Sequence, residues 1–182
     1  RTSVLVMTAF FVLVALVSTV VIRSNIRHIT EVWSPSLEYL QELETMTAKY
    51  RIKQYQHLVE SDAAAMATCE KENDNIESQI KDATAKLGEI INSNKKAQQG
   101  KADYEKATSA WEEYLSTSDE VYKLSRDNKQ AEAAKIMIGS AYESYMSFVK
   151  QLNTLHDDFQ VELDNAKTLA NICTIIIFIV II

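Results

Sequence analysis

Two apolar segments, one at each end of the chain, constrain its fold more than any other feature of the sequence. The first covers residues 4–22 without a charged side chain, and the second covers residues 169–182. A helix needs roughly 20 apolar residues to cross the hydrocarbon core of a bilayer, and the first segment nearly supplies them. We therefore predict transmembrane helices in residues 1–23 and 169–182, with a domain of residues 24–168 between them.

A cleavable signal peptide is the alternative interpretation of the first segment. Its apolar core is longer than the roughly 7 to 15 residues of such a peptide, and the R-S-N-I-R that follows has no small-residue cleavage site. The second segment is still apolar at Ile182 and is shorter than a full span. We expect its helix to continue beyond that residue, and cytoplasmic signalling domains to follow it.

The side of the membrane that the domain occupies depends on the charges beside the first span. Arg1 precedes this span and Arg23 and Arg27 follow it. This distribution slightly opposes the positive-inside tendency, which is weak for a long translocated domain. We expect a two-pass membrane protein and place its domain outside the cytoplasm.

The composition of the domain is that of a helical protein. The chain has only three Gly and one Pro among its 182 residues, far below the average usage of about 7% and 5%. Its formal net charge is −6, and without Arg1 and Arg23 the domain itself carries −8. An acidic surface of this kind does not favour nucleic acid as a partner.

Apolar residues at spacings of three and four predict four long helices joined by three turns. The turns are expected at residues 60–62, around Gly100 and at residues 126–129, while Pro35 can kink the first helix without stopping it. The fold class is therefore all-α, an antiparallel up-down-up-down four-helix bundle flanked by two transmembrane helices. The fourth helix is expected to enter the membrane without a break, with these residues among those facing inward: Ala134, Ile138, Ala141, Tyr145 and Phe148.

The sequence offers no set of catalytic or metal-binding residues. His28, His57 and His156 are scattered, and no E-x-x-H, H-E-x-x-H, C-x-x-C or phosphate-loop motif occurs. Cys69 and Cys173 lie in different predicted segments, so no internal disulfide is expected, although a Cys69 bridge between two copies stays open. We predict no catalytic residue, metal or cofactor, and hence a protein that is not an enzyme.

The inward stripe of the first helix turns polar after Leu43, and this is where we expect a ligand. Burying such groups unpaired would cost about 1 to 3 kcal/mol each, so a partner helix, water or a ligand must satisfy them. Counting from the turns brings tyrosines of the third and fourth helices to the same height. The candidate ligand-binding residues are Arg51, Thr47, Tyr50, Gln54, Tyr114, Tyr142 and Tyr145.

Arg51 admits three interpretations. Its guanidinium is a natural bidentate partner for the carboxylate of a small molecule. It could instead pair with an acidic side chain such as Glu72 inside the bundle. It could also meet a second copy of the chain in a parallel homodimer.

Several segments together resemble the four-helix-bundle sensor domain of bacterial methyl-accepting chemotaxis proteins. They are W-S-P-S at 33–36, Y-R-I-K-Q-Y-Q-H-L at 50–58, W-E-E-Y at 111–114 and Y-E-S-Y at 142–145, all between the two predicted spans. The resemblance implies a homodimeric receptor in the bacterial inner membrane, with its bundle in the periplasm or the extracellular space. Its ligand would be an organic acid or amino acid, bound near the dimer interface. It also implies a piston-like displacement of one spanning helix, relayed through a HAMP module and a signalling hairpin to a histidine kinase.

The resemblance gives Arg51 roughly the place of a ligand-binding arginine. The chain differs from the aspartate and serine receptors in having a single arginine there, flanked by Lys49 and Lys53, so their ligands do not transfer to it. Two alternatives stay open: the sensor of a membrane histidine kinase or diguanylate cyclase, and a ligandless structural or protein-binding bundle.

Overall fold

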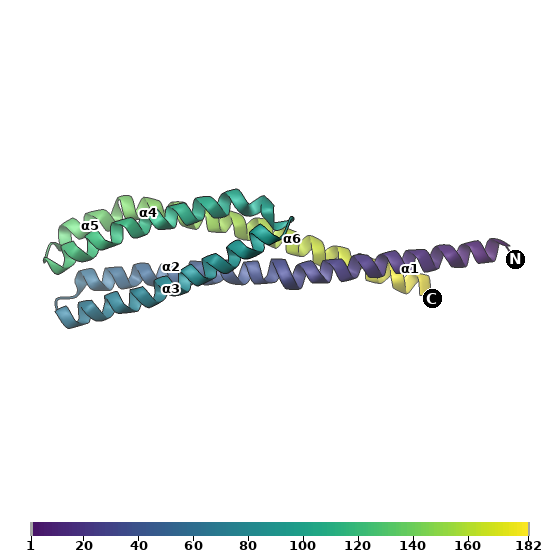
Figure 1. The fold of residues 1–182 in the computed structure, drawn as a ribbon, viewed down its shortest axis with the longest axis horizontal. Helices are drawn as coiled ribbons and strands as arrows, with labels where there is room; N and C mark the ends of the chain where they lie inside the picture. The colour runs from purple at the N-terminus through teal and green to yellow at the C-terminus, as the bar shows by residue number, and fades with distance from the viewer. Residues whose placement is uncertain (1, 182) are drawn as a thin grey trace. The chain divides into compact units, whose positions relative to one another are not determined.

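The computed structural model describes residues 2–181, and in that range every regular element is helical (Figure 1). Four long helical segments follow one another along the chain, which confirms the predicted all-α four-helix bundle. They are built from the following elements: α1 (Thr2–His28), η1 (Ile29–Trp33) and α2 (Ser34–Val59); α3 (Ala63–Ser93); η2 (Ala97–Gly100) and α4 (Lys101–Arg126); α5 (Gln130–Ile138) and α6 (Ser140–Ile181).

The chain divides into two compact units. Residues 37–157 form one, the bundle unit, and residues 1–36 together with 158–182 form the other, the end unit. The bundle unit contains all seven candidate ligand-binding residues. The domain borders predicted from the sequence, after residues 23 and 168, stay predictions.

The end unit carries the apolar segments on long helices. Helical stretches at Ser3–Val59 and Gln130–Val180 are long and apolar enough to cross a membrane, with mean hydropathies of 2.8 and 1.5 in their most apolar windows. Only 6% and 17% of those windows are buried, whereas the core helix of a water-soluble protein would bury most of such a surface. Exposed Val, Leu and Phe side chains at this density fit a lipid environment.

Pro35 coincides with a local change of helix type. Residues Ile29–Trp33 form a π-helical turn, in which the N–H of Ser34 bonds to the carbonyl of Ile29. A proline ring clashes with the carbonyl four residues earlier in an α-helix, and widening the preceding turn relieves that clash. The helix passes through Pro35, as the sequence predicted, with a π-helical turn as the local adjustment.

Two of the predicted turns owe their geometry to single polar residues. Asp62 caps α3, because its carboxylate accepts hydrogen bonds from the N–H groups of Ala64 at 2.7 Å and Ala65 at 2.9 Å. Asn128 ends α4 in the left-handed conformation with φ of 60°, and the N–H of Lys129 then reaches the carbonyl of Leu124 at 2.8 Å.

The fourth predicted helix is interrupted at Gly139, which corrects its expected continuity from Ala134 onward, whereas α6 then runs unbroken from Ser140 through the apolar segment, as expected. A Cβ atom at residue 139 would lie 2.8 Å from the carbonyl oxygen of Lys135, so the break requires glycine. Its N–H closes the end of α5 by bonding to that oxygen at 3.0 Å. The inward position on α5 is Met137, fully buried, and not Ile138, which is 67% exposed.

The core of the bundle unit has two chemically different halves. The apolar half is built from Leu40, Leu43, Leu87, Ile91, Phe148 and Leu152. The polar half is built from Thr47, Arg51, Gln54, His57, Asn73, Ser118 and Ser125. Both sets are almost completely shielded from solvent, so the change of polarity that the sequence shows after Leu43 is a change within one continuous core.

Candidate ligand-binding site

Arg51 lies at the centre of the polar half and joins α2 to α5. Its Nη2 donates to the carbonyl oxygen of Met137 at 2.8 Å and to the hydroxyl of Tyr55 at 3.0 Å. Met137 is in the last turn of α5, where carbonyl groups lack helical partners and carry partial negative charge. Arg51 therefore holds the end of α5 beside α2.

Four tyrosines surround the guanidinium of Arg51. Their ring centroids lie 5.1 to 5.8 Å from its Cζ atom, a range in which cation–π attraction is favourable. They come from three helices: Tyr55 from α2, Tyr114 from α4, and Tyr142 and Tyr145 from α6. This arrangement brings together four of the seven candidate residues.

One end of this guanidinium has no partner. The Nη1 atom of Arg51 is buried and makes no hydrogen bond with any residue that the structure describes. A buried donor of this kind costs about 1 to 3 kcal/mol, and more when charged. An acceptor brought to Nη1 would recover that free energy. Nη1 is therefore the donor at which an anion would gain the most from binding.

The site opens through two of its tyrosines. Arg51 is 9% exposed, whereas Tyr142 is 46% and Tyr55 is 38% exposed. An anion would therefore reach Nη1 by displacing one of these outer rings. Tyr145 is half-buried, and burial raises its pKa despite the opposing effect of Arg51, so it meets an anion as a neutral hydroxyl donor.

Two further candidate residues, Gln54 and Tyr50, support the site by contacting residues of α4. Gln54 donates to Ser118 Oγ at 2.8 Å and accepts from the hydroxyl of Tyr114. Burial raises the pKa of Tyr114 far above its ordinary value, which keeps that donor protonated. Tyr50 packs edge-on against Trp111, with ring centroids 5.5 Å apart.

Thr47 is the exception among the candidate residues. Its hydroxyl donates to the carbonyl of Leu43, in its own helix, at 2.7 Å. The side chain is fully buried, so it offers a ligand little in this arrangement.

Sequence reasoning missed two contacts of Arg51 and misassigned an alternative one. Glu72, the proposed internal partner, pairs instead with Lys53, at 2.6 Å. The partners that Arg51 does have are a backbone carbonyl and the hydroxyl of Tyr55. Tyr55 follows Arg51 by four residues, one turn of helix, and that spacing could have identified it.

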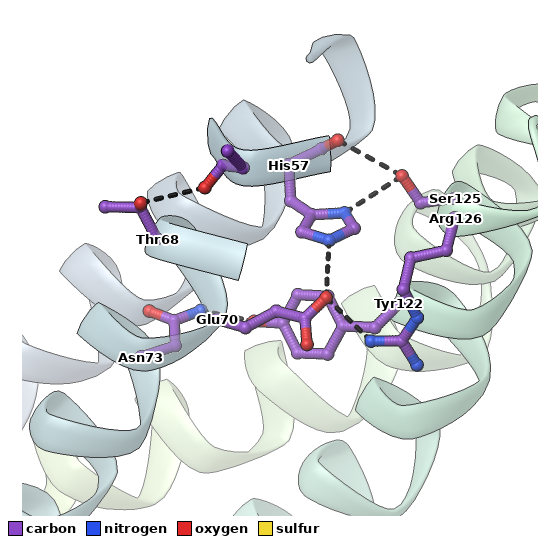
Figure 2. Close-up of polar contacts among 8 residues, drawn as sticks. His57, Thr68, Glu70, Asn73, Tyr122, Ser125 and Arg126 are labelled. Atoms are coloured by element: carbon purple, nitrogen blue, oxygen red, sulfur yellow. Dashed lines mark hydrogen bonds and ion pairs between the residues drawn. The ribbon is translucent and has the colours of Figure 1, made fainter. Parts of the chain in front are cut away.

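A second polar cluster lies near the α2–α3 turn (Figure 2). His57 is fully buried, with Nδ1 2.9 Å from Ser125 Oγ and Nε2 2.8 Å from a carboxylate oxygen of Glu70. The same oxygen accepts from Arg126 at 2.6 Å. Three helices, α2, α3 and α4, are tied together by these contacts.

The pKa of Glu70 is set by its contacts in this cluster. Partial burial alone would raise the pKa of its carboxyl group, but the hydrogen bonds from His57 and Arg126 outweigh burial and lower it.

Nearby, the amide of Asn73 donates to the hydroxyl of Tyr122 and to the carbonyl of Tyr50. The polar half is thus almost fully hydrogen-bonded, and Arg51 Nη1 and Asn73 Oδ1 are its two described exceptions.

Fold and site together define a class of protein: a helical sensory bundle whose first and last helices continue as segments apolar enough to cross a membrane. The chain belongs to the family of four helix bundle sensory modules for signal transduction, which it matches over residues 2–171. A search of curated proteins gives no match. Within the described part of the chain, no three His, Cys, Asp or Glu residues are grouped so that they could hold a metal ion.

Proposed function

We propose that this sensory module binds a small molecule carrying a carboxylate at Arg51 and transmits the event across a membrane, as a chemoreceptor does. The observation that carries the proposal is the half-paired guanidinium, with Nη2 bound to Met137 and Nη1 buried without an acceptor. A carboxylate accepts from guanidinium in a bidentate, charge-assisted geometry that a backbone carbonyl cannot match.

The helices that meet at Arg51 suggest how binding would be transmitted. Arg51 is on α2, which follows α1 through a continuous helical backbone, and Tyr142 and Tyr145 are on α6, which runs to Ile181. A carboxylate that replaced the Met137 carbonyl would release the end of α5 and α6 from α2. A ligand shifts an equilibrium only by its difference in affinity for the two arrangements, and this exchange of partners supplies such a difference.

The proposal includes a homodimer, with the bundle in the periplasm or the extracellular space. Tyr55 and Tyr142 are large, exposed aromatic side chains at the entrance of the site. A second copy packed near them would enclose the ligand further, and would exclude water from the ion pair.

The test is calorimetric titration of the full chain in lipid nanodiscs with organic acids and amino acids, each paired with its uncharged amide. We expect saturable heat from an acid and none from its amide. Arg51→Gln should abolish binding and Arg51→Lys should weaken it, because an ammonium group lacks the planar fork. Lys53→Gln is the matched control, since Lys53 lies on the same helix and pairs with Glu72. Binding that survives Arg51→Gln would refute this site.

A structural role for Arg51 is the competing function, and its bond to the Met137 carbonyl favours it. In that case Arg51→Gln would unfold the bundle unit and no acid in the panel would bind the parent chain. Under the proposal, Tyr142→Ala keeps the bundle folded and changes acid affinity. The two readouts, unfolding and titration, separate the functions.

A further inference from the structure

A groove between α3 and α4, away from Arg51, has the properties of a second binding site. It has a volume of about 320 Å³, at the lower end of the range of small-molecule sites, about 300 to 1,000 Å³. Its lining is mainly apolar and includes Ile80 and Thr84 of α3 and Tyr104, Trp111 and Leu115 of α4. Trp111 is the lining residue that also touches the Arg51 cluster, because its ring stacks on that of Tyr114.

One end of the groove is closed by Tyr104, which leans across α3. Its hydroxyl donates to the carbonyl of Thr84 at 3.0 Å. This position requires glycine at residue 88, because a Cβ atom there would come within 2.5 Å of the Tyr104 hydroxyl oxygen. The position of Tyr104 in the wall of the groove therefore depends on the close approach of α3 and α4 at Gly88.

Trp111 brings an unused hydrogen-bond donor to the groove. The residue is only 7% exposed, and its ring packs on Tyr114 and Phe148 with centroids 5.0 and 5.4 Å away. Its indole N–H has no acceptor among the described residues, and it is not one of the fully enclosed unpaired atoms. The indole N–H is therefore free to donate to a ligand.

Exposed charged residues at the rim give the groove a negative character. Glu77 of α3 and Glu112 of α4 line it and form no ion pair with a described residue, while Lys81 supplies one positive charge. Partial burial raises the pKa of Glu77, and the neighbouring Asp74 and Asp119 raise it further, against the effect of Lys81. An anion is disfavoured here, whereas a cation would relieve the repulsion among the carboxylates.

We infer that the α3–α4 groove binds an organic cation with a small apolar body, its ammonium group at Glu77 and Glu112 and its body against Trp111 and Leu115. The occupant thus has the charge opposite to that of the ligand proposed for Arg51. The cation would contact none of the seven candidate residues, so the groove can fail as a site without refuting the proposed function, although Trp111 stacks on Tyr114 and so reports on both regions.

The sequence supplies a fluorescent reporter for this groove. Trp33 and Trp111 are the two tryptophans of the chain, and Trp33→Phe leaves Trp111 as its single indole. The full chain carrying Trp33→Phe, in nanodiscs, would be titrated with 2-phenylethylammonium, 2-phenylethanol and phenylacetate. We expect a saturable change in Trp111 emission with the ammonium and a weaker one with the alcohol, whereas any response to the acid should come from Arg51 through Tyr114 and survive Glu77→Gln and Glu112→Gln.

Four variants in the same background locate the bound probe. Glu77→Gln and Glu112→Gln should each weaken ammonium binding about two- to fivefold, the scale of an exposed ion pair, and Ala85→Leu, which narrows the groove, should weaken it further. Glu113→Gln is the matched control and should change nothing, because Glu113 adjoins Glu112 and does not line the groove.

Three results would overturn the inference. The first is equal response to all three probes, which would show apolar partitioning only. The second is ammonium binding that none of the groove variants changes. The third is ammonium binding that Arg51→Gln abolishes in a folded chain, because the cation would then occupy the Arg51 cluster.

Discussion

The two halves of the bundle core exclude solvent equally well but differ in what holds them together. In the apolar half, side chains such as Leu87 and Ile91 have no exposed surface, and any apolar side chain of similar volume would serve there. In the polar half, Gln54, His57 and Asn73 are buried just as deeply, and each depends on particular partners.

The two halves therefore contribute differently to the bundle: the apolar half mainly stabilises it, and the polar half mainly fixes the positions of its helices. Apolar burial is non-directional and tolerates small displacements of the helices. A buried hydrogen bond fails when its partners move apart, so the polar half tolerates less displacement of its helices than the apolar half does. A sensor needs both properties, and this bundle separates them along its length.

The largest effect is expected in the apolar half. Leu87→Ala removes a fully buried side chain and leaves a cavity, which should lower the free energy of unfolding by about 2 to 5 kcal/mol. Urea unfolding of the full chain in nanodiscs, followed by Trp111 fluorescence in the Trp33→Phe background, measures the loss. Glu89→Ala, two residues away and exposed, is the control. A loss below 1 kcal/mol would show that the two halves do not differ as described.

An effect of similar size is expected from the polar half. Gln54→Leu leaves Ser118 and Tyr114 without their partners, at about 1 to 3 kcal/mol for each stranded group. Adding Ser118→Ala and Tyr114→Phe to this variant should recover part of the stability, because the stranded groups are then gone. The same unfolding experiment, arranged as a mutant cycle, measures the coupling. Additive losses would mean that the hydrogen bonds act independently of one another.

Acid should weaken the polar half selectively through Glu70. Its pKa is lowered in the folded protein from the ordinary value of 4.5, so its contribution to stability is complete above that value. That contribution is lost as pH falls below 4.5 through the folded pKa. Unfolding measured across this window should show the slope in the parent chain and a reduced slope in Glu70→Gln.

The smallest effect is expected at the turn that closes the polar half. Asp62→Ala removes the cap of α3 and should cost about 0.5 to 2 kcal/mol. Hydrogen exchange should accelerate at the N–H groups of Ala64 and Ala65, which bond to Asp62. Ser61→Ala, at the adjacent residue, should leave both unchanged. If both variants exchange alike, the cap contributes nothing at this turn.

Much of the fold follows from periodicity in the sequence. The stripe from Trp33 through Leu40, Leu43 and Tyr50 to Leu58 was predictable, since residues three and four apart share a helix face, and all five are buried. The three turns also carried local signals, in Asp62, in the polar run that ends at Gly100 and in R-D-N-K at 126–129. The break at Gly139 carried no such signal, because a lone glycine within a helical pattern can be accommodated without a break. As a result, Ala134 and Ile138 were predicted to face inward, although the buried position is in each case the residue before them.

The candidate site was predictable in its members and not in its bonds. Periodicity and counting from the turns placed Arg51, Tyr114, Tyr142 and Tyr145 at one height, and the structure brings them together. The acceptor that Arg51 uses is a backbone carbonyl, which becomes available only because α5 ends where it does. Because every residue has a backbone carbonyl, the sequence does not indicate which one accepts from Arg51.

The π-helical turn at Ile29–Trp33 has a consequence for comparisons between members of this family. One residue inserted into a helix rotates everything beyond it by about 100° relative to everything before it. Numbering a binding residue outward from the start of α1 would therefore assign Arg51 to the wrong face in any relative that lacks this turn. Positions equivalent to Arg51 are better found by counting back from the α2–α3 turn, because no such insertion lies between Ser34 and Val59.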